Sequence, residues 1–350
     1  MLKINKLCAI FMASLSLLIA TKVTAQDDSD NRITTLRLEA RADFDYNRST
    51  DGSSETYGFY GRYFNLHMGG NLSNKVSYYL RQRIIADNGT HNFFDNTDFL
   101  YINYMPNEHW RFRFGKDAMA IGGFEYDAAP IDVYYNGVYW DNFYCFQLGA
   151  SLAYLTNEGK HSLVAQVTNT PYNGFGADWG NFSYNLMWAG HMGHFHTLWS
   201  ASVFDKGLAT SAPGDRLAYF AAGNKLAFDH WNMYVDLMAH YDNSDIVYRS
   251  MVARLELRFN EGWSLFGKGV YEEGTGVIED IFFPYDGRRA MAGVGFENHP
   301  RYCRDLRYHA YVAFEKTSNG VNGGYEGISA NVGLTWNINV LKSLERRYNW

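Results

Sequence analysis

The sequence is poor in cysteine and proline, and it has no long apolar run after its first 25 residues. Only Cys145 and Cys303 lie beyond that point, and two cysteines cannot build a disulfide framework. We expect both to be buried or half-buried thiols. The missing apolar run excludes a transmembrane helix, which needs about 20 apolar residues. The formal net charge of −6 argues against a nucleic-acid partner.

Residues 1–25 have the pattern of a secretory signal peptide. Lys3 and Lys6 precede an apolar stretch over residues 7–20, and Val23 and Ala25 are small residues at the positions that a signal peptidase reads. We expect cleavage before Gln26, so that residues 26–350 form the mature domain. An uncleaved anchor helix is the alternative, but the apolar stretch is short for one.

Alternation of apolar and polar residues is the clearest pattern in the mature chain. It predicts β-strands, because successive side chains of a strand point to opposite faces. The clearest case covers 13 residues, long for a strand of a soluble protein but suited to a tilted membrane-spanning strand. Its apolar face consists of Ile328, Ala330, Val332, Leu334, Trp336, Ile338 and Val340. In residues 36–46 the opposite face is charged, which predicts a wet interior and an apolar exterior.

About sixteen amphipathic segments follow one another between residues 33 and 340, and helical periodicity is not persuasive anywhere. Aromatic residues make up 17% of the chain, as expected of a barrel with aromatic girdles at both membrane interfaces. We therefore predict an all-β fold, a sixteen-stranded antiparallel transmembrane barrel. Its strands are expected at 33–46, 57–69, 75–87, 97–105, 109–116, 143–155, 160–169, 182–191, 195–205, 216–228, 231–242, 247–260, 262–273, 288–298, 305–316 and 326–340.

The connections between these segments alternate between short and long. Outer-membrane barrels have short periplasmic turns and longer external loops, and this pattern places the long connections outside. The longest, residues 117–142, is then the third external loop. It contains Ile121, Phe124, Ile131 and several tyrosines, which are too apolar for a loop in water. We expect it to fold inward, pack on the lumen wall and narrow the channel.

Six arginines have the parity of the barrel interior. Alternation places them on one region of the inner wall, where they would form a positive strip that favours anions. They are Arg37, Arg41, Arg81, Arg83, Arg111 and Arg113. Acidic residues of the inward loop, Glu125, Asp127 and Asp132, could supply the opposing wall of the constriction. The alternative is that the interior must be polar in any barrel and that these charges simply pair.

Other chemistry has little support in the sequence. His191, His194 and His196 are spaced as possible metal ligands, but no cysteine or carboxylate lies nearby, and we expect exposed turn histidines instead. The common hydrolase, metalloprotease and phosphate-loop motifs are missing. We therefore predict no catalytic residue, no metal and no cofactor. A lipase or protease built on the barrel rim is an alternative that sequence alone does not exclude.

Several stretches of the sequence resemble a known family. They are Gly61–Leu66, Ser77–Arg83, Phe114–Asp117 and Gly122–Asp127, and together they resemble the phosphate-selective porin O and P family. The match is densest over residues 59–170 and is closest to versions from Bacteroidetes-type outer membranes. The resemblance implies a sixteen-stranded homotrimeric porin with an arginine-lined constriction, formed by Arg81, Arg83, Arg111 and Arg113, and possible phosphate preference.

The chain departs from the family pattern in its acidic net charge and in its C-terminal residues. Residues 341–350 follow the last alternating segment, and we interpret them as a periplasmic tail. We predict an outer-membrane porin, surrounded by lipid, that passes small hydrophilic and preferably anionic solutes by diffusion. The alternative is a non-conducting barrel that serves as an adhesin or a structural anchor.

Overall fold

The computed structural model describes residues 33–84, 94–137, 140, 144–172, 180–206, 216–243, 245–275, 286–318 and 324–341. The predicted signal peptide, and all but the first residue of the predicted tail, lie outside this part of the chain. Sixteen strands form one closed antiparallel barrel in which each strand pairs with its neighbours in sequence, and β1 pairs with β16 to close it. The predicted fold class is therefore confirmed.

The strands agree closely with the sixteen predicted segments, because alternation is a local signal. They are β1 (Thr35–Ser49), β2 (Glu55–Asn71), β3 (Val76–Arg83), β4 (Thr97–Tyr104), β5 (Trp110–Ala118), β6 (Phe146–Leu155), β7 (His161–Asn169), β8 (Phe182–Met192), β9 (Phe195–Asp205), β10 (Arg216–Ala227), β11 (Trp231–Asp242), β12 (Asp245–Asn260), β13 (Trp263–Thr275), β14 (Asp286–Asn298), β15 (Leu306–Ser318) and β16 (Glu326–Asn339).

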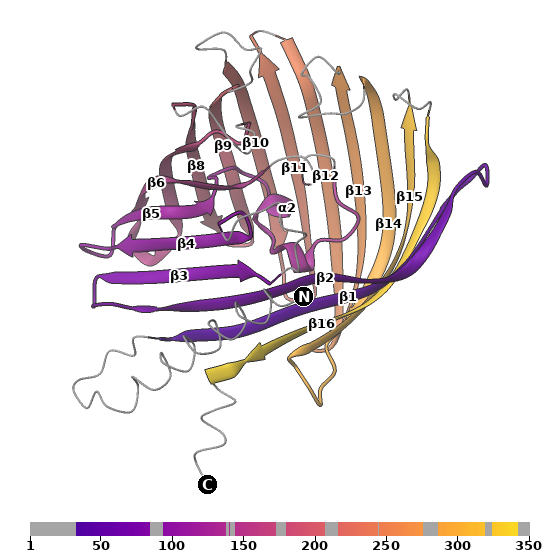
Figure 1. The fold of residues 1–350 in the computed structure, drawn as a ribbon, viewed down its shortest axis with the longest axis horizontal. Helices are drawn as coiled ribbons and strands as arrows, with labels where there is room; N and C mark the ends of the chain where they lie inside the picture. The colour runs from indigo at the N-terminus through magenta and orange to yellow at the C-terminus, as the bar shows by residue number, and fades with distance from the viewer. Residues whose placement is uncertain are drawn as a thin grey trace, which may run out of the picture.

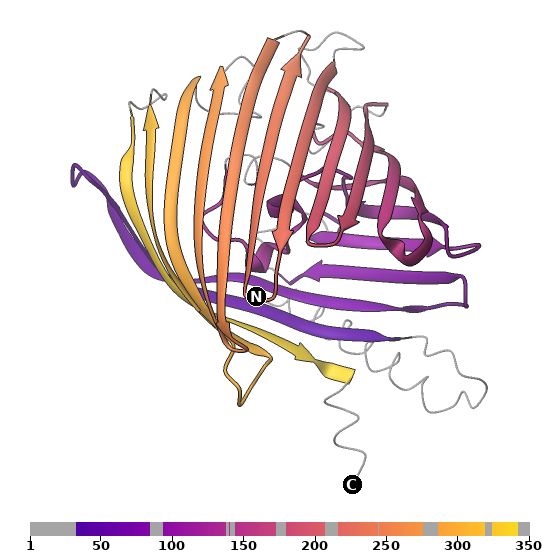
Figure 2. The same ribbon diagram turned by 180° about the vertical axis from the view of Figure 1, so that it is seen from behind.

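The barrel wall is uneven in height (Figure 1). Strands β3 to β5 have eight or nine residues, whereas β12 to β16 have between 13 and 16. The long strands form one side of the molecule, seen from behind in Figure 2. Among the described residues, no helix is both long enough and apolar enough to span a bilayer.

The segment after β5, from Met119 to Gly137, lies inside the ring of strands. It contains a single helical turn, α2 (Phe124–Asp127), and a 3-10 turn, η1 (Pro130–Asp132). Figure 1 shows α2 between the short strands and the long ones. We call residues 119–137 the inner loop.

Part of the barrel interior on one side is apolar rather than wet. Met119 and Ile121 of the inner loop pack with inward side chains of β9 to β14, among them Phe204, Leu217 and Tyr219. These strands therefore carry large apolar residues on both faces near their external ends, which the expectation of a uniformly wet lumen missed. The physical reason is that the loop needs an apolar surface to cover. The open space is left on the side of β3 to β7.

Candidate functional site

A cavity of about 700 Å³ lies between the inner loop and strands β3 to β8. Arg81 and Arg83 come from β3, and Arg111 and Arg113 from β5, so four of the six predicted arginines line one space. The two members of each pair are two residues apart on a strand and therefore point to the same face. We call these four residues the arginine cluster.

Carboxylates hold three members of the cluster in place. Asp98 of β4 accepts from Arg81 Nε at 2.8 Å and from Arg83 Nη2 at 2.8 Å. Asp117 accepts from Arg113 Nη1 at 2.5 Å. Charge-assisted bonds of this kind fix guanidinium groups in one geometry.

Two donor groups of the cluster are not bound by a described carboxylate. Arg81 is 95% buried, yet its Nη2 has no partner in the described part of the chain. Arg111 makes no ion pair with a described carboxylate, although it lines the cavity. The described lining contains four arginines and two aspartates, Asp117 and Asp127. Asp98 adds a third carboxylate that pairs with two of the arginines, so four positive charges face three negative ones and one positive charge remains in excess.

Aromatic rings of β4 lie between the two arginine pairs. Phe99 and Tyr101 face inward, whereas Leu100 and Ile102 between and after them face outward. The guanidinium carbon of Arg81 lies 4.3 Å from the centre of the Phe99 ring, and that of Arg113 lies 3.9 Å from the centre of the Tyr101 ring. These distances are typical of cation–π stacking. The rings support the arginines and give the cavity an apolar strip.

The other two predicted arginines lie elsewhere. Arg41 is 5% exposed, and its Nε and Nη2 bind the Asp43 carboxylate, while its Nη1 donates to the carbonyl oxygen of Val133 at 2.9 Å. Arg37 pairs with Glu39 at 3.7 Å and contacts His67 at 3.2 Å. Neither lines the cavity.

The three predicted acidic residues are also divided. Only Asp127 lines the cavity with the arginine cluster. Glu125 is buried and pairs with Lys268 of β13 at 2.5 Å. Asp132 pairs with Arg307 of β15. Enclosure by the surrounding walls raises the pKa of the Asp127 carboxyl, and the nearby Lys225 ammonium opposes that shift.

Glu125 and Asp132 belong to a set of contacts that ties the inner loop to the long strands. Asp236 of β11 accepts from the backbone N–H of Phe124 at 2.9 Å and of Glu125 at 2.8 Å. Lys268 also donates to the Tyr134 carbonyl at 3.0 Å. Each bond satisfies a loop backbone group that would otherwise be buried without a partner.

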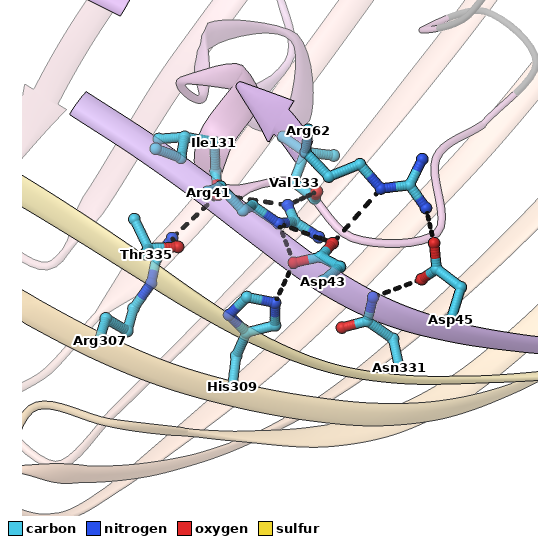
Figure 3. Close-up of polar contacts among 10 residues, drawn as sticks. All are labelled: Arg41, Asp43, Asp45, Arg62, Ile131, Val133, Arg307, His309, Asn331 and Thr335. Carbon is cyan, nitrogen blue, oxygen red and sulfur yellow. Dashed lines mark hydrogen bonds and ion pairs between the residues drawn. The ribbon is translucent and has the colours of Figure 1, made fainter. Parts of the chain in front are cut away.

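Further contacts reach the loop from the strands that close the barrel (Figure 3). The Ile131 carbonyl accepts from Arg41 of β1 at 3.3 Å and from Arg307 of β15 at 2.9 Å. Two bonds beside these join the closing strands to one another: Asp43 binds His309 of β15 at 3.1 Å, and Asp45 binds Asn331 of β16 at 2.5 Å. The loop is thus held against the long wall, and the cavity lies between the loop and the arginine cluster.

Sequence reasoning missed Asp98, Phe99, Tyr101 and Asp117 as part of this site. The signal was present for the two aromatic residues, because alternation over residues 97–104 gives them the interior parity. The pairing of Asp98 with two arginines of β3 depends on a register shift between Arg81 and Gln82, which the sequence pattern does not show.

The predicted alternatives can also be located. His191 and His196 stack with ring centres 4.2 Å apart, and His194 contacts the Ala227 carbonyl at 2.9 Å. No group of three or more possible metal ligands occurs in the described ranges. Cys145 and Cys303 are both half-buried free thiols.

Comparison with known families identifies the family and the fold. Residues 34–261, more than half of the chain, match the family of phosphate-selective porin O and P. The chain belongs to this family. It is an outer-membrane porin, a channel with a multi-pass β-barrel. No curated protein sequence matches it.

Solved structures of other porins share its fold at low sequence identity. An anion-selective porin from Comamonas acidovorans has a TM-score of 0.63 at 12% identity, over 87% of this chain and 99% of that one. The outer membrane channel DcaP of Acinetobacter baumannii has a TM-score of 0.63 at 11% identity, over 90% and 100%. The trimer form of OmpT from Vibrio cholerae has a TM-score of 0.58 at 10% identity, over 87% and 99%.

Proposed function

We propose that this porin passes small hydrophilic solutes by diffusion through the cavity between the inner loop and β3 to β8, with a preference for anions. The observation that carries the proposal is the arginine cluster, whose four guanidinium groups exceed the three described carboxylates around them, Asp98, Asp117 and Asp127. A pore wall of net positive charge attracts anions and repels cations. Because the long-strand side is filled by the inner loop and its apolar contacts, solutes pass next to the arginines.

Arg111 is the sharpest probe of this proposal, because it makes no described ion pair whose loss would disturb the wall. We expect Arg111→Glu to shift the reversal potential of a planar bilayer in a salt gradient toward cations. Arg258→Gln is the matched control, because Arg258 is half exposed, pairs with Glu256 and does not line the cavity. An unchanged reversal potential in Arg111→Glu would remove the cluster from ion selection. Absence of channel steps from folded wild-type protein would favour the anchor alternative.

The substrate and the assembly belong to the same proposal. We propose that phosphate is among the permeant anions, which the family description supports. We also propose a homotrimer, supported by the trimer form of the Vibrio cholerae neighbour and by the exposed apolar outer face of β4 and β5, which includes Leu100, Ile102 and Phe114. Chemical cross-linking in detergent, with bands up to three subunits expected, tests the trimer.

Export and membrane type complete the proposal. We propose that residues 1–25 are removed before Gln26, that residues 341–350 form a periplasmic tail, and that the porin serves a Bacteroidetes-type outer membrane. The leader pattern of Lys3, Lys6 and Ala25 supports the first point. Sequencing the N-terminus of protein taken from outer membranes tests it, with Gln26 expected as the first residue.

A further inference from the structure

We infer that the cavity is a binding site for organic anions that carry a flat apolar ring, of the aryl carboxylate class, rather than only a charged passage for inorganic ions. The inference rests on the proposed function and deepens it by naming a substrate class. Two features of the described residues carry it: donors of the arginine cluster that have no protein partner, and aromatic side chains placed between those donors.

The anion end of such a ligand has a defined place to bind. Arg81 Nη2 is buried and points its hydrogens at no described acceptor, which is costly for a guanidinium group unless a ligand supplies one. Arg111 adds a second guanidinium group without a carboxylate partner on the same cavity wall. Asp98 holds Arg81 by its Nε edge, at 2.8 Å, and Nη2 takes no part in that bond. A carboxylate accepts bonds from such a group in a planar arrangement.

The ring end has a matching surface. Strand β4 runs between β3 and β5, so its inward side chains Phe99 and Tyr101 lie between the two arginine pairs, about 5 Å from each neighbouring strand. Phe146 of β6 packs edge-on against Phe99, with ring centres 5.2 Å apart. Met119 of the inner loop and Met187 of β8 add soft apolar groups to the lining. Sulfur and aromatic groups both make favourable contacts with an aromatic ring.

This composition suits an aryl carboxylate better than it suits phosphate. A hydrated inorganic oxyanion gains from the guanidinium groups but nothing from an aromatic strip, and it loses water to reach it. An aliphatic carboxylate of equal charge gains from the arginines but cannot stack. A benzoate-type anion gains from both, because its carboxylate and its ring reach two different parts of one wall.

The test compares three anions as blockers of chloride current through single channels of the full-length mature protein in planar bilayers. Benzoate, propanoate and phosphate are added at matched ionic strength and pH 7. We expect the half-blocking concentration of benzoate to be lower than that of either other anion by about fivefold to tenfold. This is the gain in affinity that one or two aromatic ring contacts usually give. Equal potency of benzoate and propanoate in an anion-selective channel would overturn the inference and leave the proposed function standing.

Two variants separate the ring from the charge. Phe99→Leu keeps an apolar side chain but removes the ring, and it should raise the benzoate half-blocking concentration to that of propanoate. Arg111→Gln should weaken block by all three anions, whereas the control Arg258→Gln should leave it unchanged. Retained benzoate preference in a conducting Phe99→Leu channel would overturn the role given to the ring.

Two other outcomes of these recordings would overturn the inference. Phosphate as the strongest blocker would replace the inference with a site for inorganic oxyanions. A channel that conducts chloride and potassium equally would end both the proposed anion preference and the binding site. Because the wild-type comparison needs no variant, misfolding of a variant does not remove the test.

Discussion

Lys268 of β13 reaches the Glu125 carboxylate of the inner loop at 2.5 Å, and both side chains are at most 5% exposed. This buried pair fixes α2 to the long wall. Its two partners come from segments more than 130 residues apart, so the contact exists only when loop and barrel have both formed. Removing one partner leaves a buried charge without compensation, which costs about 3–5 kcal/mol.

We therefore expect Lys268→Met to loosen the inner loop. Glu125 would remain buried without its cation, and the loop carbonyls of Tyr134 and Tyr135 would lose a donor. Single-channel recordings should show a larger and noisier conductance. The double variant Lys268→Met with Glu125→Leu removes both charges. Its free energy of unfolding and its current noise should be closer to those of the wild type than in Lys268→Met alone. A quiet Lys268→Met channel of unchanged conductance would contradict the anchoring role of the pair.

Close approach of the loop backbone to β9 gives a second prediction. A Cβ atom on Gly122 would lie 2.3 Å from the carbonyl oxygen of Leu198, and backbone cannot move aside as a side chain can. Gly122→Ala should displace the loop, at a cost of about 1–3 kcal/mol, and raise the conductance. Gly61→Ala on β2 is the matched control, because nothing lies within 4 Å of the added atom. Identical conductance in the two variants would show that the inner loop does not set the width of the channel.

Removal of the Asp98 charge should increase the anion selectivity of the channel. Asp98 neutralises part of the charge of Arg81 and Arg83, and Asp98→Asn keeps its shape while removing that charge. We expect the reversal potential to shift further toward anions. Asp229→Asn is the control. It removes a carboxylate from the turn between β10 and β11, away from the cavity, and should leave the reversal potential unchanged. A shift toward cations in Asp98→Asn would mean that the arginines leave the cavity when released.

Protonation of Asp127 should make the anion selectivity of the channel depend on pH. Enclosure raises the pKa of this carboxyl above that of an ordinary aspartate, so it becomes neutral at a higher pH during acidification. Loss of its negative charge makes the cavity more positive. We expect the anion-to-cation permeability ratio to rise as the pH falls, beginning above the usual aspartate range.

Matched variants test the assignment to Asp127. In Asp127→Asn the ratio should be higher at pH 7 than in the wild type and should rise by less on acidification. In Asp51→Asn the pH dependence should persist, because Asp51 lies in an external turn, and hydrogen bonds from Ser53 lower its pKa to about 2. A rise of undiminished size in Asp127→Asn would contradict the assignment to Asp127.

The two described thiols predict different reactivity. Burial raises the pKa of the Cys145 thiol to about 12, so the reactive thiolate is scarce near neutral pH. Cys303 lies in the turn between β14 and β15 and is half-buried. A maleimide probe on the folded protein in detergent should therefore label Cys303 first, and Cys303→Ser should remove the fast phase. Fast labelling that persists in Cys303→Ser but disappears in Cys145→Ser would contradict this.

Local patterns in the sequence were sufficient for the strands but not for the site. Alternation over residues 328–340 or 97–104 depends only on neighbouring residues, and the observed β16 and β4 follow it. The same alternation gives Arg41 and Arg81 equal parity. It cannot show that Arg41 is bound by Asp43 and by loop carbonyls, while Arg81 keeps a donor toward the cavity. That difference depends on the path of the inner loop, which no periodicity describes.

The division of Glu125, Asp127 and Asp132 has the same origin. Within one short segment, helical turning sends Glu125 toward β13 and leaves Asp127 facing the cavity. An acidic loop was therefore predictable as a group, whereas its division between anchoring and lining was not. The apolar side chains of β9 to β14 inside the barrel could have indicated where the loop packs, because Leu217 and Tyr219 do not fit a wet wall.

The Ile131 carbonyl joins the two ends of the polypeptide's strand order, because Arg41 of the first strand and Arg307 of the fifteenth both bind it. Both bonds to this carbonyl are therefore present only when the first and the last strands are in place around the inner loop. Pairing of β16 with β1 brings β15 and its Arg307 to the Ile131 carbonyl that Arg41 also binds. We therefore expect that closure of the barrel and full attachment of the inner loop occur together during assembly.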